Sequence, residues 1–229
     1  MEKARWMHLN FTMAKPMYGR IFLQPGLALA NAIENVGLGD YTLPTLNNIS
    51  PLESAPLIYN NGRAVTVRNM RWSFHAASSR KPPSANPSNV VVDCKELLSD
   101  PLYQTAMIQH RGVVPTSAYV EWETEARSRQ PYYIQGLIEP LLLPAIWNLW
   151  QGELYSFAIV TKSVKEKSLA GEDCLPVFMT ITQARRWMDL TENVADLLND
   201  FNQTTIEVTR RKISNSVNDP ENKASVRFL

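Results

Sequence analysis

Residues 112–137, GVVPTSAYVEWETEARSRQPYYIQGL, decide the fold class. Apolar and polar residues alternate from Gly112 to Trp122, which is the period of a half-buried β-strand. A polar stretch at 123–129 separates this run from a second strand-like run at 131–137. The two runs therefore predict an antiparallel hairpin in the middle of the chain.

Further strands and helices are expected on both sides of this hairpin. Two more hairpins are predicted around the turns Asn60-Asn61-Gly62 and Gln151-Gly152, with strands at 57–59, 64–74, 142–149 and 155–161, and a short strand at 89–92. Helices are predicted at 27–36, after the capping box Thr180-x-x-Gln183, and after Thr191. Loops are expected at 40–56 and 77–88, and a tail at 215–229.

This pattern predicts an α+β fold: a single domain with a mostly antiparallel, barrel-like sheet and flanking helices. Residues 1–16 are interpreted as an N-terminal extension, and residues 17–229 as the domain.

Composition excludes several classes of protein. The chain has 229 residues, 45% hydrophobic and 20% charged, which is typical of a globular protein rather than a disordered one. Lys and Arg total 23 against 22 Asp and Glu, so total charge favours neither nucleic acid nor membrane. Cys94 and Cys174 are far apart, and the three histidines are scattered, so we expect no metal and no cofactor. Without an apolar run of about 18 residues, we expect no membrane partner and a cytoplasmic location.

One carboxylate lies among aromatic residues. On a strand, Glu121 shares a face with Tyr119 and Glu123, while Val120 and Trp122 face the other way. Such a carboxylate can have a raised pKa and act as an acid or base. The alternative is a solvated residue at a sheet edge, which the local pattern favours.

The order of several short motifs resembles the SOS response-associated peptidase family. Met17-Tyr18-Gly19-Arg20 is similar to the MCGR start of that family, and Asn48-Ile49-Ser50-Pro51 to its NxAP loop. Arg71-Trp72 falls where an RWGL strand lies, and residues 111–122 resemble its R-C-L-x-P-A-x-G-[FWY]-[FY]-E-W segment. The match continues to Arg210-Arg211 and Val217-Asn218, so it covers most of the chain.

The resemblance implies a protein that binds single-stranded or junction DNA in a basic channel, in the context of DNA damage and abasic-site repair. In the family, an N-terminal cysteine condenses with the aldehyde of an abasic site, and Asn, Glu and His line the site. The positions that correspond to DNA contacts are Arg20, Asn48, Arg71, Trp72, Arg111 and Arg210. The corresponding catalytic positions are Tyr18, Asn89, Glu121 and Glu172.

The sequence departs from the family at the positions that carry the chemistry. Tyr18 stands at the cysteine position, and a phenol cannot close a thiazolidine-type ring. Glu172 stands at the histidine position, and Val91 where an Arg beside Asn89 would hold phosphate. A register without gaps would put Val91 at the Asn position instead. Only Glu121 is clearly retained.

We therefore predict a pseudoenzyme that binds DNA without covalent crosslinking, in a bacterial or phage-infected cell. One alternative is an active lyase or hydrolase that uses Glu121 and Glu172 as acid and base. Another is a protein-interaction module, for example a viral or mobile-element accessory protein or inhibitor. Several residues also have plain structural interpretations: Trp72 as core, Cys174 as a buried inert thiol and the arginines as solvated residues. Arginines that converge on one groove would favour DNA, and dispersed arginines a protein partner.

Overall fold

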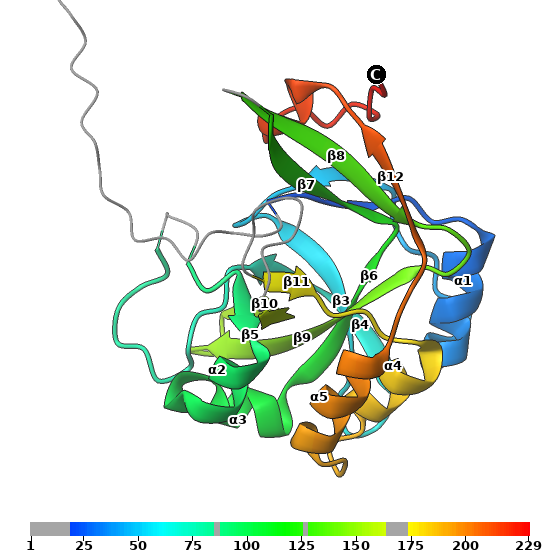
Figure 1. The fold of residues 1–229 in the computed structure, drawn as a ribbon. Helices are drawn as coiled ribbons and strands as arrows, with labels where there is room; N and C mark the ends of the chain where they lie inside the picture. The colour runs from blue at the N-terminus through cyan, green and yellow to red at the C-terminus, as the bar shows by residue number, and fades with distance from the viewer. Residues whose placement is uncertain (1–18, 85–87, 126–127, 164–173) are drawn as a thin grey trace, which may run out of the picture.

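The computed structural model describes residues 19–84, 88–125, 128–163 and 174–229. Its centre is a closed ring of five strands (Figure 1): β3 (Ser54–Asn60), β4 (Val65–Trp72), β6 (Arg111–Thr116), β9 (Leu141–Trp150) and β10 (Leu154–Ser163). Pairing runs from β10 through β4, β3, β6 and β9 and returns to β10. All five pairs are antiparallel except β10 with β4. The expected barrel-like sheet is confirmed.

Two short strands extend this barrel along β10. β5 (Val91–Asp93) pairs with it in parallel, and β11 (Cys174–Pro176) pairs with its end in antiparallel orientation.

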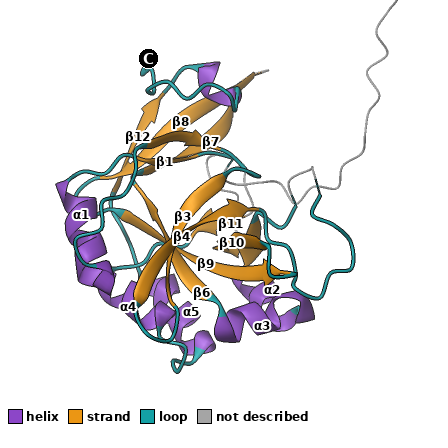
Figure 2. Ribbon diagram, turned by 180° about the vertical axis from the view of Figure 1, so that it is seen from behind, coloured by secondary structure: helices purple, strands orange, loops and turns teal. Residues whose placement is uncertain are grey.

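A second sheet stands over one side of the barrel (Figure 2). Its order is β12 (Val208–Lys212), β8 (Ser128–Gly136), β7 (Ala118–Glu125), β1 (Ile21–Leu23) and β2 (Leu46–Ile49). One face of this sheet joins the main core through Ile21, Tyr119 and Ile134. The other face buries Tyr133 in a smaller core that residues 213–226 help to form. We call residues 213–228 the C-terminal segment.

Helices cover the barrel. They are α1 (Leu27–Ile33), which continues as a π-helical turn at Glu34–Leu38, α2 (Cys94–Ser99), α3 (Pro101–Gln109), α4 (Ile181–Met188) and α5 (Val194–Gln203). Trp187 of α4 is fully buried, and its Nε1 donates to the carbonyls of Gly112 and Ala145 at 2.9 and 3.2 Å. Gly112 is required here, because a Cβ atom would lie 2.3 Å from Leu57 Cδ2 and 2.8 Å from the Ile58 carbonyl oxygen.

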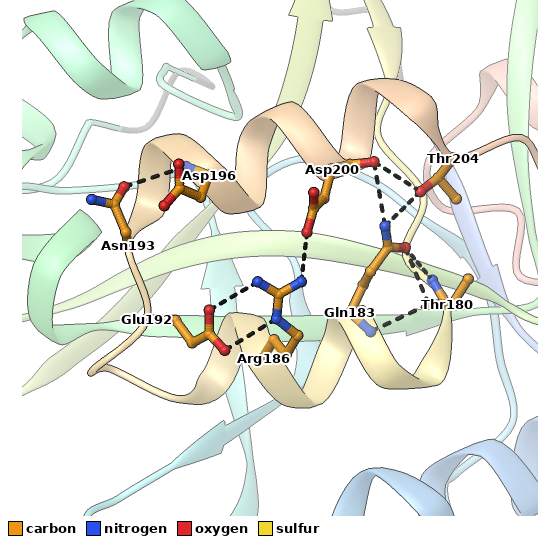
Figure 3. Close-up of polar contacts among 8 residues, drawn as sticks. All are labelled: Thr180, Gln183, Arg186, Glu192, Asn193, Asp196, Asp200 and Thr204. Atoms are coloured by element: carbon orange, nitrogen blue, oxygen red, sulfur yellow. Dashed lines mark hydrogen bonds and ion pairs between the residues drawn. The ribbon is translucent and has the colours of Figure 1, made fainter.

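The hairpin of α4 and α5 is held by a polar network (Figure 3). The predicted capping box is present, since the Gln183 backbone N–H donates to Thr180 Oγ1 and Gln183 Oε1 accepts from the Thr180 backbone N–H. Arg186 of α4 pairs with Glu192 at 2.9 Å and with Asp200 of α5 at 2.5 Å. These contacts fix the 189–193 loop between the two helices.

Four sequence predictions need correction. The expected loop at 40–56 contains β2 and the start of β3, and the expected single strand at 112–122 is two strands in different sheets. The chain crosses between the sheets at Ser117, whose backbone N–H and Oγ both donate to the Phe22 carbonyl at 2.9 Å. Helices α2 and α3 lie in the middle of the chain, where strands were expected and helices only at the flanks. The expected tail at 215–229 includes a buried Val217 and a 3-10 helix at Asn215–Asn218.

Candidate nucleic-acid interface

Glu121 lies on β7, at the margin of the main core. The Tyr119 hydroxyl donates to Glu121 Oε1 at 2.8 Å, which confirms that the two side chains share a face. Tyr119 is itself buried, and its ring centroid lies 5.9 Å from that of Phe178, just after β11. Burial raises the pKa of the Glu121 carboxyl, although the Tyr119 hydrogen bond and Arg210 act in the opposite direction. This carboxyl therefore keeps its proton to a higher pH than an exposed glutamate does.

A cation and an aromatic ring lie beside this carboxyl. Tyr132 of β8 is directly opposite Glu121 in the β7–β8 ladder. The Arg210 guanidinium, from β12, lies 3.3 Å from the centroid of the Tyr132 ring. Arg210 also pairs with Glu123 Oε2 at 2.5 Å. We call Tyr119, Glu121, Glu123, Tyr132 and Arg210 the Glu121 cluster.

Arg20 and Asn48, expected to contact DNA, bind the C-terminal segment. Arg20 Nε donates to the Val217 carbonyl at 3.1 Å, and its Nη2 donates to the Asn218 carbonyl at 2.9 Å. Asn48 is buried, and its Nδ2 donates to the carbonyls of Asp219 and Asn222 at 2.8 and 2.9 Å. In this structure both side chains hold the C-terminal segment against the sheet.

Two other expected DNA contacts lie in the core. Trp72 is 0% exposed, and its Nε1 donates to the Val90 carbonyl at 2.9 Å, so its ring has no open face for a base. Arg111 is 2% exposed and lies 5.4 Å from the Trp187 ring. Arg71 is half-buried, and its Nη2 donates to the Ser84 carbonyl at 2.7 Å. The sequence pattern did not reveal that the Arg111 side chain is buried rather than exposed.

The remaining catalytic positions are not gathered at Glu121 in the described part of the chain. Asn89 is exposed, has φ +50°, and accepts the Phe74 N–H on its carbonyl just before β5. Tyr18 and Glu172 lie outside the described residues. Cys94, at the start of α2, is half-buried, and burial raises the pKa of its thiol to about 12, which makes it inert.

The arginines of the described chain do not converge on one groove. Arg68 lies over Tyr155 on the barrel at 4.2 Å, whereas Arg210 belongs to the second sheet. Arg211 is the neighbour of Arg210 on β12 and lies over Phe228 at 3.8 Å, on the opposite face of that sheet. Within the described residues, Arg210 is the one that lies beside Glu121 among Arg20, Arg68, Arg71, Arg111, Arg210 and Arg211.

Sequence reasoning missed Tyr132 as a member of this cluster. The alternation of β7 already placed Glu123 on the face of Glu121, and the hairpin pattern would pair that face with β8. Among the described residues, no group of three or more His, Cys, Asp or Glu side chains could hold a metal ion. No helix in the same residues is long and apolar enough to cross a membrane.

Comparisons with solved structures show the same fold in three bacterial proteins. A phage-related protein from Bordetella bronchiseptica has a TM-score of 0.66 and 20% identity, covering 84% of this chain and 93% of its own. A second protein from Bordetella bronchiseptica has a TM-score of 0.68 and 13% identity, covering 85% and 98%. A protein from Bacteroides thetaiotaomicron has a TM-score of 0.63 and 20% identity, covering 74% and 79%.

A search of the curated proteins found no match. The model of the SOS response associated peptidase (SRAP) family matches residues 17–220, the span over which the motifs occur in order. This match covers nearly the whole described structure, including both sheets and the Glu121 cluster. The chain belongs to the SOS response associated peptidase family.

Proposed function

We propose that this protein binds single-stranded or junction DNA at the Glu121 cluster and forms no covalent adduct with it. The observation that carries the proposal is the Arg210 guanidinium over the Tyr132 ring, next to the half-buried Glu121. Proteins that bind single strands combine cations for phosphate with aromatic and guanidinium planes for bases. Membership of a family named for the SOS response supports a role in the response to DNA damage.

The absence of an adduct follows from the residue at position 18. A stable adduct with an aldehyde needs an amine that forms an imine and a thiol that closes the ring. Tyr18 supplies no thiol, and because residues precede it, its backbone nitrogen is an amide. Glu121 and Glu172 could exchange protons, but neither replaces the missing nucleophile.

The binding test is fluorescence anisotropy with a labelled oligothymidylate of about 15 nucleotides and with a labelled three-way junction, over a range of salt concentrations. Each phosphate neutralised on a single strand contributes about −0.7 to the slope of log K against log salt. Arg210→Ala removes one such contact and should make the slope less negative by about 0.7. Arg211→Ala is the matched control, because the neighbouring side chain lies on the other face against Phe228. Equal effects of both variants would contradict binding at the Glu121 cluster.

The adduct test is incubation with abasic single-stranded DNA followed by heat denaturation and electrophoresis. We expect no band that survives denaturation, and Tyr18→Cys in a chain that starts at Met17 should produce one. A wild-type crosslink that persists in the Cys94→Ser/Cys174→Ser double variant would overturn the proposal. Cleavage of the abasic strand, lost in Glu121→Gln, would instead support the lyase alternative.

A second candidate is a protein-interaction module that uses the same scaffold. The dispersed arginines favour it, because Arg20 and Arg111 are committed to carbonyl oxygens within the fold. Absence of DNA binding even at low salt would select this candidate over the first.

A further inference from the structure

A row of aromatic side chains leads from the core of the barrel to one of its ends. Phe157 of β10 is fully buried, and its ring is stacked with that of Trp72 at 6.4 Å between centroids. Trp147 of β9 is directly opposite Phe157, and Tyr155 lies two residues before Phe157, so these three side chains share the inward face. The ring centroids of Trp147 and Tyr155 are 5.9 Å apart, with 35° between their planes.

Two further rings hold Trp147 in this row. The imidazole of His110 is stacked on its indole, with 4.2 Å between centroids and 27° between planes. Tyr59 of β3 is 7% exposed, and its ring centroid lies 4.8 Å from that of Trp147. Because its rings are packed against neighbours from several strands, the row can support a ligand without rearranging.

Arg68 of β4 covers the outer end of the row. Its guanidinium carbon lies 4.2 Å from the centroid of the half-buried Tyr155 ring. Arg68 alternates along β4 with Met70 and Trp72, which are buried, so its side chain belongs to the inward face. Arg68 is nevertheless exposed, which shows that solvent reaches this end of the barrel. We call the following four residues the Arg68 stack: Arg68, Tyr155, Trp147 and His110.

The positive charge of Arg68 has no acidic partner. Among the described residues, no Asp or Glu forms an ion pair with it. A hydrogen bond with Tyr59 and the nearby Tyr155 hydroxyl raise the pKa of Arg68, and no carboxylate of the described chain contributes. Arg210, by contrast, is already paired with Glu123. A negatively charged ligand can therefore approach Arg68 without displacing a carboxylate.

We propose that the Arg68 stack binds a nucleotide. The base would stack on the exposed side of the Arg68 guanidinium, whose other side lies over Tyr155, and the N–H groups at its edge would bind the phosphate. The mouth of a β-barrel is a preferred place for such ligands. This site belongs to the barrel and not to the second sheet, so it is additional to the Glu121 cluster. The nucleotide is either free or part of a single strand, which share this chemistry.

The experiment is an NMR titration of the isotope-labelled full chain with adenosine monophosphate, adenosine and ribose phosphate. We expect saturable binding of adenosine monophosphate with a Kd of about 1 mM or lower, with shifts at the Trp147 indole N–H and the Arg68 amide. Adenosine and ribose phosphate should each bind at least about tenfold more weakly. Equal binding of ribose phosphate would show that no base stacks, and equal binding of adenosine that no anion is bound; either result overturns the proposal. Absence of these shifts at about 10 mM adenosine monophosphate would also overturn it.

Two exposed arginines supply the matched variants. Arg68→Ala should abolish binding of adenosine monophosphate. Arg63→Ala removes the same charge from the turn between β3 and β4, where the side chain lies over none of the described aromatic rings, and should leave the Kd unchanged. Circular dichroism checks that both variants fold. Binding that survives Arg68→Ala lies elsewhere and contradicts the proposal.

A conservative variant separates stacking from charge. Arg68→Lys keeps the positive charge but has no planar group on which a base can stack. It should therefore bind adenosine monophosphate and ribose phosphate with the same Kd. A preference of this variant for adenosine monophosphate as large as that of the wild type would contradict stacking on Arg68.

A last comparison identifies the source of the nucleotide. It uses the Arg210→Ala variant, which weakens the Glu121 cluster, and compares deoxyadenosine monophosphate with an oligodeoxyadenylate of about 15 nucleotides. Tighter binding of the oligonucleotide that is lost on adding Arg68→Ala assigns the Arg68 stack to a strand, and equal or weaker binding assigns it to a free nucleotide. Failure of the function proposed above would appear instead as equal salt slopes of the wild type and Arg210→Ala, so the two failures are distinguishable.

Discussion

Tyr119→Phe removes a single hydroxyl from the core and leaves Glu121 without its hydrogen bond. Tyr119 is 4% exposed, so the ring stays packed against Phe178, while the bond to Glu121 Oε1 is lost. A hydrogen bond to a charged group contributes about 1.5–3 kcal/mol, and one between neutral groups about 0.5–1.5 kcal/mol. The cost of the variant should therefore depend on the protonation of Glu121.

The raised pKa of Glu121 determines how its contribution to the free energy of unfolding changes with pH. As pH rises from the ordinary glutamate pKa of about 4.3, the unfolded chain loses this proton before the folded chain does. The contribution of Glu121 to the free energy of unfolding is therefore largest below that pH and falls as pH rises through the raised pKa. Without the Tyr119 hydroxyl the pKa of Glu121 rises further, so the fall continues to higher pH.

Urea unfolding at about pH 4 and about pH 8 measures this difference. We expect Tyr119→Phe to lower the free energy of unfolding by about 1 kcal/mol at the lower pH and about 2 kcal/mol at the higher. Tyr133→Phe is the control, because Tyr133 is buried on the opposite face of the sheet, in the smaller core, whose buried members include no carboxylate. Its cost should be the same at both pH values. An equal cost of Tyr119→Phe at both pH values would refute the reasoning.

Three further results are expected. Gly112→Ala should lower the free energy of unfolding by about 3 kcal/mol, because the added Cβ atom would meet the backbone of Ile58. Gly26→Ala, whose Cβ atom would have no neighbour within 4 Å, should change the free energy of unfolding very little in the same urea assay. Arg20→Ala leaves two carbonyls of the C-terminal segment without a donor and should cost about 1–3 kcal/mol in thermal unfolding, with faster hydrogen exchange at 217–222. Glu123→Gln removes the ionic partner of Arg210 and should tighten binding of oligothymidylate in the anisotropy assay; weaker binding would show that Glu123 positions Arg210 rather than competing for it.

Local patterns predicted the hairpins and the starts of α1 and α4. The turn at Gln151-Gly152 contains two residues with positive φ, at +49° and +76°, and the capping box at Thr180 forms as its sequence indicates. Such features depend on a few neighbouring residues and can be recognised without the rest of the fold.

Features that depend on distant residues could not be predicted. No Gly, Asn or Asp lies between Val113 and Val120, so none of these turn signals marks the passage from one sheet to the other at Ser117. Helix α3 has apolar residues on all its sides and therefore gives no amphipathic signal. In the candidate site, alternation placed Tyr119 with Glu121, but Arg210 meets Glu123 across 87 residues of sequence. The motif match placed Arg20 and Arg111 at positions that correspond to DNA contacts. It could not show that their N–H groups donate to backbone carbonyls within the fold.

The contact between Arg20 and Val217 joins residues 197 positions apart. β1, near the start of the described chain, is covered by residues 213–226, which are synthesised almost 200 residues later, and β12 completes the same sheet from 208–212. Folding of such a protein is slow, because long loops must close before their contacts stabilise anything. During synthesis the barrel strands, from 54 to 163, can pair while the second sheet still lacks its last strand and its cover. The apolar face around Tyr133 is then open to chaperones or to other chains until residues 213–226 have been synthesised and cover it.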